Sequence, residues 1–266
     1  FMTKHLVLGN GESRAWFNPS EKKIVTNDVI TWGCNAIYRD GDVNNLVAID
    51  HGIQQEIYDS QYHKWNQCWF ADWNILPASV VDGLLMTADF AEDFVHKSKK
   101  VTDQCVIAGA DPKLRAEKIK SATEQFPNLD MKDLQIKMGK DVGVWITYVN
   151  EDDNIKNIDF PKKWSAGNTA IHLACQQGAK EVYLLGFDLS SPNKLINNIY
   201  KGSEYYFPED ARGFTPVSWM NQMGTVFNEF PDTKFYWVGR EEDGVFSEKN
   251  IRYLTKEELC DILNIQ

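Results

Sequence analysis

Two short segments of this sequence carry the residue types that bind phosphate groups. In the first, LVLGNGESR, an apolar run breaks into Gly9, Asn10 and Gly11, and Ser13 and Arg14 follow. Glycines let backbone N–H groups approach an anion closely, hydroxyl and amide groups donate hydrogen bonds to it, and arginine can pair with two of its oxygens. This turn is therefore predicted to hold a phosphate group. A Gly-x-Gly sequence also fits a tight bend after a strand, and that alternative stays open.

The second segment, WSAGNTAIHLACQQG, has the pattern of a helix that begins with small residues. Ser165 suits the N-cap position, and the apolar residues after it recur with helical spacing. Small side chains leave the N–H groups of the first turn open to an anion. In WGCNAIY another apolar run ends at an asparagine, which adds a side-chain amide. We therefore expect one nucleotide-binding site formed by Gly9, Asn10, Gly11, Ser13, Arg14, Asn35, Ser165, Gly167, Asn168 and Thr169.

Several of these residues also have a purely structural interpretation. For Arg14 the alternative is an ion pair at the protein surface. For Asn10 and Asn35 it is a hydrogen bond within the local turn. Arg14 also stands where a G-x-G-x-x-G motif has its third glycine, which disfavours a dinucleotide as the ligand.

Three residues at the ends of predicted strands are candidates for a general base. Asp50 and His51 follow the apolar run NNLVAI, and Asp188 follows VYLLGF. A carboxylate or an imidazole at a strand end can point into a cleft and take a proton from a reacting hydroxyl. Neighbouring side chains point in opposite directions there, so only one of Asp50 and His51 is expected in the site. Capping of the next turn is the alternative for the carboxylates, and it is strongest for Asp188.

The apolar runs that precede these residues alternate with helical patterns along the chain. Runs that are apolar throughout and end in small or polar residues are typical of parallel strands buried on both faces. The sequence therefore predicts an α/β fold, with a Rossmann-like, mostly parallel sheet, helices on both faces and a site at the strand tips. We expect one domain over residues 2–266, with an insertion or lid at 110–160 and a lid loop at 190–215.

The composition limits the partners and the location of the protein. The formal net charge is -10, whereas proteins that mainly grip nucleic acid carry a basic excess, so a nucleic-acid substrate would need a local basic face. The cysteines form no C-x-x-C pair and the acids no metal-binding spacing, so we expect reduced thiols and no bound metal. No apolar run reaches the roughly twenty residues of a membrane span and no signal-peptide pattern is present, which predicts a cytoplasmic protein without a membrane partner.

Two blocks of the sequence resemble a known group of enzymes. LVLGNGES with GCNAIY, and SAGNTAIHLACQQGAKEVYLLGFDLS, are similar to the Rossmann-like glycosyltransferases related to bacterial sialyltransferases. They are also similar to the wider set that includes archaeal pterin pyrophosphokinase-like proteins. The resemblance implies a single-domain GT-A-like fold of the sialyltransferase type. It also implies that a nucleotide sugar is lined by Gly9, Asn10, Gly11, Ser13, Asn35, Ser165, Gly167 and Thr169, with Asp188 closing the pocket.

The chain departs from the sialyltransferases in one respect. Those enzymes have a histidine base late in the chain, and this sequence has no histidine after His172. Asp50 or His51 is therefore expected to act as the base. The chain also resembles transferases of large tailed phages, some of which add arabinose to hydroxymethylcytosine in DNA. For this chain the resemblance implies a UDP-sugar rather than a CMP-sugar donor, and hydroxymethylated DNA as one acceptor.

These observations lead to one hypothesis and two alternatives. The hypothesis is a metal-independent glycosyltransferase that needs no cofactor. In it, Arg14 or Lys201 and helix N–H groups stabilise the departing phosphate, and aromatic residues of YKGSEYYF could stack on a sugar or a flipped base. The first alternative is a Mg²⁺-dependent pyrophosphokinase of the pterin type, and the second is a nucleotide-binding protein without catalysis. The sequence does not indicate the oligomeric state.

Overall fold

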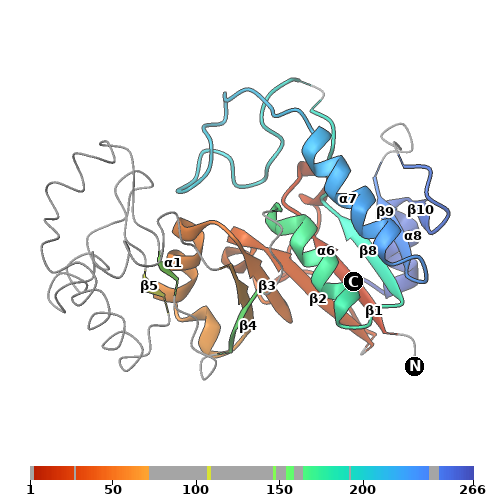
Figure 1. Cartoon of the computed structure of the whole chain (residues 1–266), viewed down its shortest axis with the longest axis horizontal. Helices are drawn as coiled ribbons and strands as arrows, with labels where there is room; N and C mark the ends of the chain where they lie inside the picture. The colour runs from red at the N-terminus through yellow and green to blue at the C-terminus, as the bar shows by residue number, and fades with distance from the viewer. Residues whose placement is uncertain are drawn as a thin grey trace, which may run out of the picture. The chain divides into compact units, whose positions relative to one another are not determined.

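The computed structural model of the chain describes residues 3–26, 28–71, 107–108, 146–147, 154–158, 164–191, 193–239 and 246–266 (Figure 1). The backbone divides into two compact units. The first consists of Phe1–Val47 and Phe160–Gln266, and the second of Ala48–Asp159. Most of the insertion expected at 110–160 lies outside the described residues.

The first unit is built on a parallel sheet with strand order β10-β9-β8-β1-β2-β3. Every strand pair described in it is parallel. Leu6, Val7 and Leu8 of the central strand are fully buried, as expected for a strand covered on both faces. The Rossmann-like α/β fold is thereby confirmed. The strands span Lys4–Leu8 (β1), Val29–Cys34 (β2), Asn45–Ala48 (β3), Glu181–Leu185 (β8), Lys234–Val238 (β9) and Ile251–Leu254 (β10).

The strand order places a topological switch point beside β1. From β1 the chain order runs outward to β2 and β3 on one side, and from β8 to β9 and β10 on the other. The connections that leave the carboxyl ends of β1 and β8 therefore lead to opposite halves of the sheet. Ligands of doubly wound folds bind at such a point, so this edge is where a site is expected.

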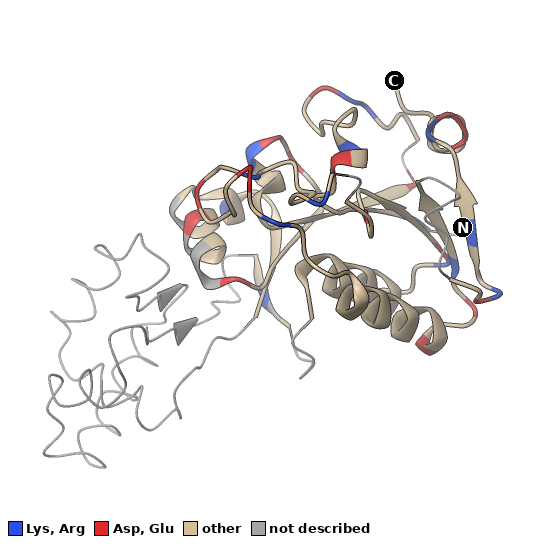
Figure 2. Cartoon of the chain, turned by 90° about the horizontal axis from the view of Figure 1, so that it is seen from above, with Lys and Arg blue, Asp and Glu red and all other residues tan. Residues whose placement is uncertain are grey.

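Three helices of the first unit cover the two faces of the sheet. They are α6 (Ala166–Gln176), α7 (Val217–Glu229) and α8 (Lys256–Leu263). Ser165 caps α6 by accepting a hydrogen bond from the Asn168 N–H, and Gly178 lies beyond its end with a φ of +86°. A capping box of Thr255 and Glu258 begins α8. Figure 2 shows α8 on the opposite side of the sheet from α6 and α7.

The second unit has a smaller described part. In it, β4 (Gln67–Phe70) pairs with β7 (Ile155–Asn157), and β5 (Ile107–Ala108) pairs with β6 (Ile146–Thr147), both in parallel. Helix α1 (His51–Asp59) carries Gln54, whose buried amide donates hydrogen bonds to the carbonyls of Ala48 at 2.8 Å and Ala71 at 3.0 Å. No helix among the described residues of either unit is long and apolar enough to span a membrane.

Candidate functional site

The turns that follow β1 and β8 interlock at the carboxyl edge of the sheet. The Gly9 N–H donates to the Leu185 carbonyl, and the Gly11 N–H donates to the Gly186 carbonyl, both at 2.8 Å. A Cβ atom on Gly9 would lie 2.4 Å from the Gly186 oxygen, and Gly186 itself has a φ of +81°. The glycines are therefore required for the close contact between the two turns. Their N–H groups donate to protein carbonyls and are therefore not open to an anion.

The next two N–H groups of the turn bind side chains from the segment after β8. They belong to the short 3-10 helix η1 (Glu12–Arg14). The Glu12 N–H donates to the side-chain oxygen of Asn197, and the Ser13 N–H donates to the Asp188 carboxylate, each at 2.8 Å. Asp188 thus caps η1 from a distant part of the sequence. Its carboxylate occupies the position that we predicted for a phosphate oxygen.

Arg14 lies in the interior, which corrects both sequence-based interpretations of this residue. It is 1% exposed, and its guanidinium donates to the carbonyls of Gly9 at 2.8 Å and Phe17 at 3.1 Å. It also donates to the Tyr200 hydroxyl at 3.0 Å and pairs with Asp40 at 3.5 Å. A buried guanidinium has lost its hydration, so its N–H groups need protein acceptors in place of water, and these four groups supply them. Arg14 is neither exposed to a phosphate nor part of a surface ion pair.

In the turn after β1, two buried polar atoms have no hydrogen-bond partner among the described residues. They are the side-chain oxygens of Asn10 and Ser13. The other end of the Asn10 side chain is engaged, because its amide donates to the Cys34 carbonyl at 3.2 Å and to the Tyr206 hydroxyl at 3.5 Å. A buried polar atom without a partner costs about 1–3 kcal/mol. Two such atoms in one turn therefore indicate a place for a polar ligand.

Asn35 has a backbone role at the tip of β2. It adopts a φ of 50° and begins the 3-10 helix η2 (Asn35–Arg39). Asparagine tolerates this left-handed conformation better than most residues. A hydrogen bond of its side chain within the turn stays a prediction. The preceding Cys34 donates from Sγ to the Leu8 carbonyl at 3.2 Å, and burial raises the pKa of its thiol to about 12. The tips of β1 and β2 are thus tied together.

The start of α6 approaches the same edge. A Cβ atom on Gly167 would lie 3.0 Å from the Phe187 ring and 3.9 Å from the Cys34 Sγ. The side-chain amide of Asn168, by contrast, donates to the Gln222 side chain at 2.9 Å and to the Trp219 carbonyl at 3.3 Å, both on α7. Asn168 and Thr169 are only 2% and 1% exposed. Of the residues predicted here, Gly167 is near the strand tips, whereas Asn168 holds α6 against α7.

Part of the loop predicted as a lid lies over the tips of β1 and β2. The Ile199 N–H donates to the Asn10 carbonyl at 2.9 Å, and the Ala36 N–H donates to the Tyr206 hydroxyl at 3.3 Å. Lys201 forms an ion pair with Glu12. Each contact joins the loop to the turns beneath it. The structure therefore brings this loop into the candidate site.

Sequence reasoning missed two residues of this edge, Asp40 and Asn197. Burial raises the pKa of the Tyr200 hydroxyl, which stays protonated and donates to Asp40. Asp40 lies in a polar turn, and Asn197 lies in a loop of many similar residues. Nothing in their spacing separates them from ordinary surface positions.

Two candidates for the base belong to the second unit. Asp50 occupies the N-cap position of α1, where its side chain accepts no capping hydrogen bond. His51 is the first residue of that helix, and its side chain lies outside the described structure. Asp188 is the one candidate that lies with the nucleotide-site residues of the first unit. A shared role for Asp50 or His51 in that site stays a prediction.

No group of three or more histidine, cysteine or acidic residues in the described ranges is arranged to hold a metal ion. His172, in α6, packs edge-on against Trp164 and Phe230, with its Nε2 3.1 Å from the Glu229 carboxylate. This is the packed helix position that its sequence context indicates. The candidate site is therefore made of backbone, amide, hydroxyl and carboxylate groups.

The edge formed by the turns after β1, β2 and β8 is the best-defined candidate site of the first unit. It combines two buried oxygens without a partner in the described part of the chain, two N–H groups that donate to side chains, and a loop in contact with the turns. Comparisons with protein-family models, with curated proteins and with solved structures found no match. The resemblance to glycosyltransferases thus stays a hypothesis, and the fold is the level at which the chain is classified.

Proposed function

We propose that this chain binds a nucleotide sugar at the carboxyl ends of β1, β2 and β8 and transfers the sugar to an acceptor hydroxyl. The observation that carries the binding part is the pair of buried oxygens on Asn10 and Ser13 that have no partner among the described residues. Both lie in the turn after the central strand, next to the switch point of the sheet. Hydroxyl and amine groups of a ribose or a base are donors that would satisfy them.

The phosphates of such a ligand would bind the N–H groups of Glu12 and Ser13. In the structure these groups bind the Asn197 and Asp188 side chains at 2.8 Å. A phosphate oxygen is a stronger acceptor than an amide oxygen and carries the negative charge that the carboxylate supplies here. Binding would therefore displace Asp188 and Asn197 from the turn. The displaced Asp188 carboxylate would then be free to act beside the ligand.

The transfer part of the proposal is supported by the sequence resemblance alone. A base, either Asp188 or a group at Asp50 or His51, takes the proton of the acceptor hydroxyl. The acceptor oxygen attacks the anomeric carbon, and the bond from that carbon to the diphosphate breaks, releasing the nucleoside diphosphate. A UDP-sugar is the first donor to test, and hydroxymethylcytosine in DNA is the first acceptor.

Ser13→Ala gives the sharpest test of the binding part. Because the Ser13 hydroxyl has no partner within the described structure, its removal is expected to leave the free energy of unfolding unchanged or to raise it by up to about 1 kcal/mol. The same variant should lose the stabilisation by ligand, which is about 2.7 kcal/mol for the wild type at a hundredfold excess over Kd. Thermal unfolding with UDP, CMP, GDP, ADP and their sugar conjugates measures both effects.

The matched control is Ser20→Ala, because Ser20 is exposed and its hydroxyl binds only Asn18 nearby. Its ligand-dependent shift should equal that of the wild type. An undiminished shift in Ser13→Ala, or no shift with any nucleotide, would contradict the proposal. A shift that needs ATP and Mg²⁺ together would favour the pyrophosphokinase. Binding of a nucleotide sugar without its hydrolysis or transfer would favour the binding protein.

A further inference from the structure

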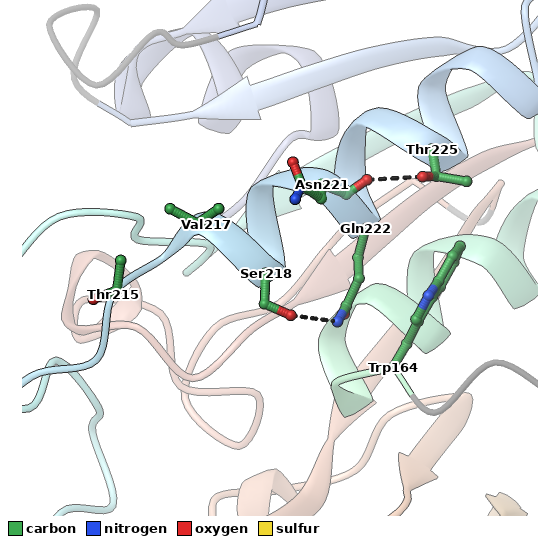
Figure 3. A pocket seen from close by; sticks show the side chains of 7 residues that line it. All are labelled: Trp164, Thr215, Val217, Ser218, Asn221, Gln222 and Thr225. Atoms are coloured by element: carbon green, nitrogen blue, oxygen red, sulfur yellow. Dashed lines mark hydrogen bonds between the residues drawn. The ribbon is translucent and has the colours of Figure 1, made fainter.

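A cavity lies on the face of the first unit that α6 and α7 form. It has a volume of about 650 Å³, is open to solvent, and is lined by Trp164, Thr215, Val217, Ser218, Asn221, Gln222 and Thr225. Figure 3 shows Ser218 and Gln222 projecting from α7 toward the start of α6, where the Trp164 ring stands beside them. The volume falls in the range of roughly 300–1,000 Å³ that small-molecule sites occupy.

None of the described side chains that line the cavity is charged. Of these seven residues, five carry a hydroxyl or a carboxamide, and the others are a tryptophan and a valine. Among the described residues, α6 has no Lys, Arg, Asp or Glu, and α7 has Glu229 alone, at its last position (Figure 2). A charged ligand would lose hydration against these side chains without gaining an opposite charge from them. The described lining therefore favours a neutral ligand.

Several polar groups of the lining are free to bind a ligand. The side chains of Asn221 and Thr215 have no hydrogen-bond partner in the described part of the chain, and both are exposed. Ser218 accepts a hydrogen bond from Gln222 at 3.2 Å and keeps its own hydroxyl hydrogen to donate. Gln222 itself is fixed, because its side-chain oxygen accepts from the Ser165 N–H at 3.0 Å and from Asn168 at 2.9 Å. The cavity thus presents both donors and acceptors on a fixed helix face.

The cavity also has an aromatic side. The Trp164 ring lies beside Ser218 and Gln222 (Figure 3). An aromatic ring beside neutral hydroxyl and amide groups suits a ligand with apolar C–H faces and hydroxyl edges.

We propose that this cavity binds a neutral saccharide. A sugar ring offers hydroxyls that both donate to and accept from Asn221, Ser218 and Thr215, and C–H groups that pack on the Trp164 ring. None of the side chains that line the cavity is proposed to bind the nucleotide, so the two proposals can be tested separately.

Saturation-transfer NMR with the whole chain tests the proposal. The probes are maltose, lactose, cellobiose and diacetylchitobiose at millimolar concentration, and glucuronic acid and glucose 6-phosphate as charged counterparts. At least one neutral disaccharide is expected to receive saturation, and the charged sugars are not. An equal signal from the charged sugars, or none from any neutral one, would overturn the proposal.

Asn221→Ala and Asn228→Ala form a matched pair on the same helix. Both residues are exposed, but only Asn221 lines the cavity, because the Asn228 side chain donates back to the Gly224 carbonyl at 2.8 Å. Asn221→Ala should weaken saccharide binding about tenfold, and Asn228→Ala should leave it unchanged. Nucleotide-dependent stabilisation should be the same in both variants. Equal saccharide affinity in the two variants would place the ligand elsewhere and overturn the assignment.

Discussion

At the scale of single residues, Arg14 is the centre of the candidate site's internal support. Its guanidinium joins the turn after β1 to Phe17, Asp40 and Tyr200, although these residues are far apart in the sequence. Arginine offers five donors in a planar array, which no other side chain can do. The sequence suggests Arg14 as a ligand for phosphate, whereas in the structure its hydrogen bonds stabilise the turn after β1.

Arg14→Lys is expected to lower the free energy of unfolding by at least about 3 kcal/mol. A lysine keeps the charge, but it cannot reach all four acceptors, and buried oxygens would lose their partners. Denaturation by urea measures the change. Arg212→Lys, at an exposed position, is the control and should change stability by less than about 0.5 kcal/mol. A small effect of Arg14→Lys would show that Arg14 is accessible to solvent.

His5 makes the stability of the first unit depend on pH. It is 1% exposed, and its Nδ1 accepts a hydrogen bond from the Trp32 indole at 3.0 Å, which requires the neutral ring. Burial lowers the pKa of His5 from 6.5 to about 4. Between pH 6.5 and about pH 4, His5 therefore binds a proton in the unfolded chain but not in the folded chain. The contribution of His5 is present above pH 6.5 and is lost as the pH falls toward 4.

The expected loss from this one group between pH 7 and pH 5 is about 2 kcal/mol. Urea unfolding at the two pH values, for the wild type and for His5→Gln, measures it. Glutamine can still accept from Trp32 but does not titrate, so the variant should lose less stability on acidification. Parallel pH profiles for the two proteins would contradict the assignment.

At the scale of elements, the contact between the turns after β1 and β8 fixes the geometry of the strand tips. Gly9→Ala would place a Cβ atom 2.4 Å from a backbone oxygen that cannot move without shifting β8. We expect a loss of stability of about 1–3 kcal/mol, as for other overpacked sites. Thermal and urea unfolding both report it.

Gly224→Ala is the matching control for this substitution. Gly224 lies within α7, and a Cβ atom there would meet its nearest neighbour, Glu248, at 3.5 Å, which is an ordinary contact. Alanine favours the helix by about 0.5–1 kcal/mol over glycine, so this variant should be as stable as the wild type or more stable. If Gly9→Ala is equally well tolerated, the two turns are not in contact in solution.

The elements of the first unit could largely be predicted from the sequence, because their apolar runs are short, regular and bounded by clear signals. The strand tips at Gly9 and Asn35 and the N-cap Ser165 were identified. Strand β10 was missed, since IRYL is brief and mixes a charge with apolar residues.

The partners of the site residues could not be predicted in the same way. Gly-Asn-Gly indicates a backbone that something approaches closely, but not whether a phosphate or the turn after β8 approaches it. Likewise, the type of Arg14 indicates an anion or several carbonyls, and only the fold decides between them. The position of Asp188 after a strand end was predicted correctly, but its carboxylate caps η1, which is distant in the sequence, and not the turn that follows it.

At the scale of the whole molecule, the labelling rates of the cysteines measure how readily each unit unfolds. Cys34 and Cys175 are buried in the first unit and Cys68 in the second, and burial raises the pKa of each thiol to about 12. Cys260 is partly exposed on α8. Because the thiolate is the reactive form, native labelling followed by mass spectrometry should modify Cys260 before Cys34, Cys68 and Cys175.

Cys34 and Cys175 should react slowly and at similar rates, since both are released by opening of the same sheet and helix. A rate for Cys68 that differs from theirs would show that the two units unfold separately. Rapid labelling of Cys34 in the native protein would contradict the tight packing of the β2 tip.

The place of β1 at the centre of the sheet has a consequence during synthesis. Its Lys4 pairs with Val29 of β2 and with Glu181 of β8, so one neighbour follows soon and the other only much later. At roughly 5–20 residues per second, the ribosome reaches β8 on the order of 10 to 35 s after β1. Until then β1 presents a bare strand edge that can pair with other nascent chains. Chains stalled before Glu181 are therefore expected to be chaperone clients, and synthesis through β8 should release them.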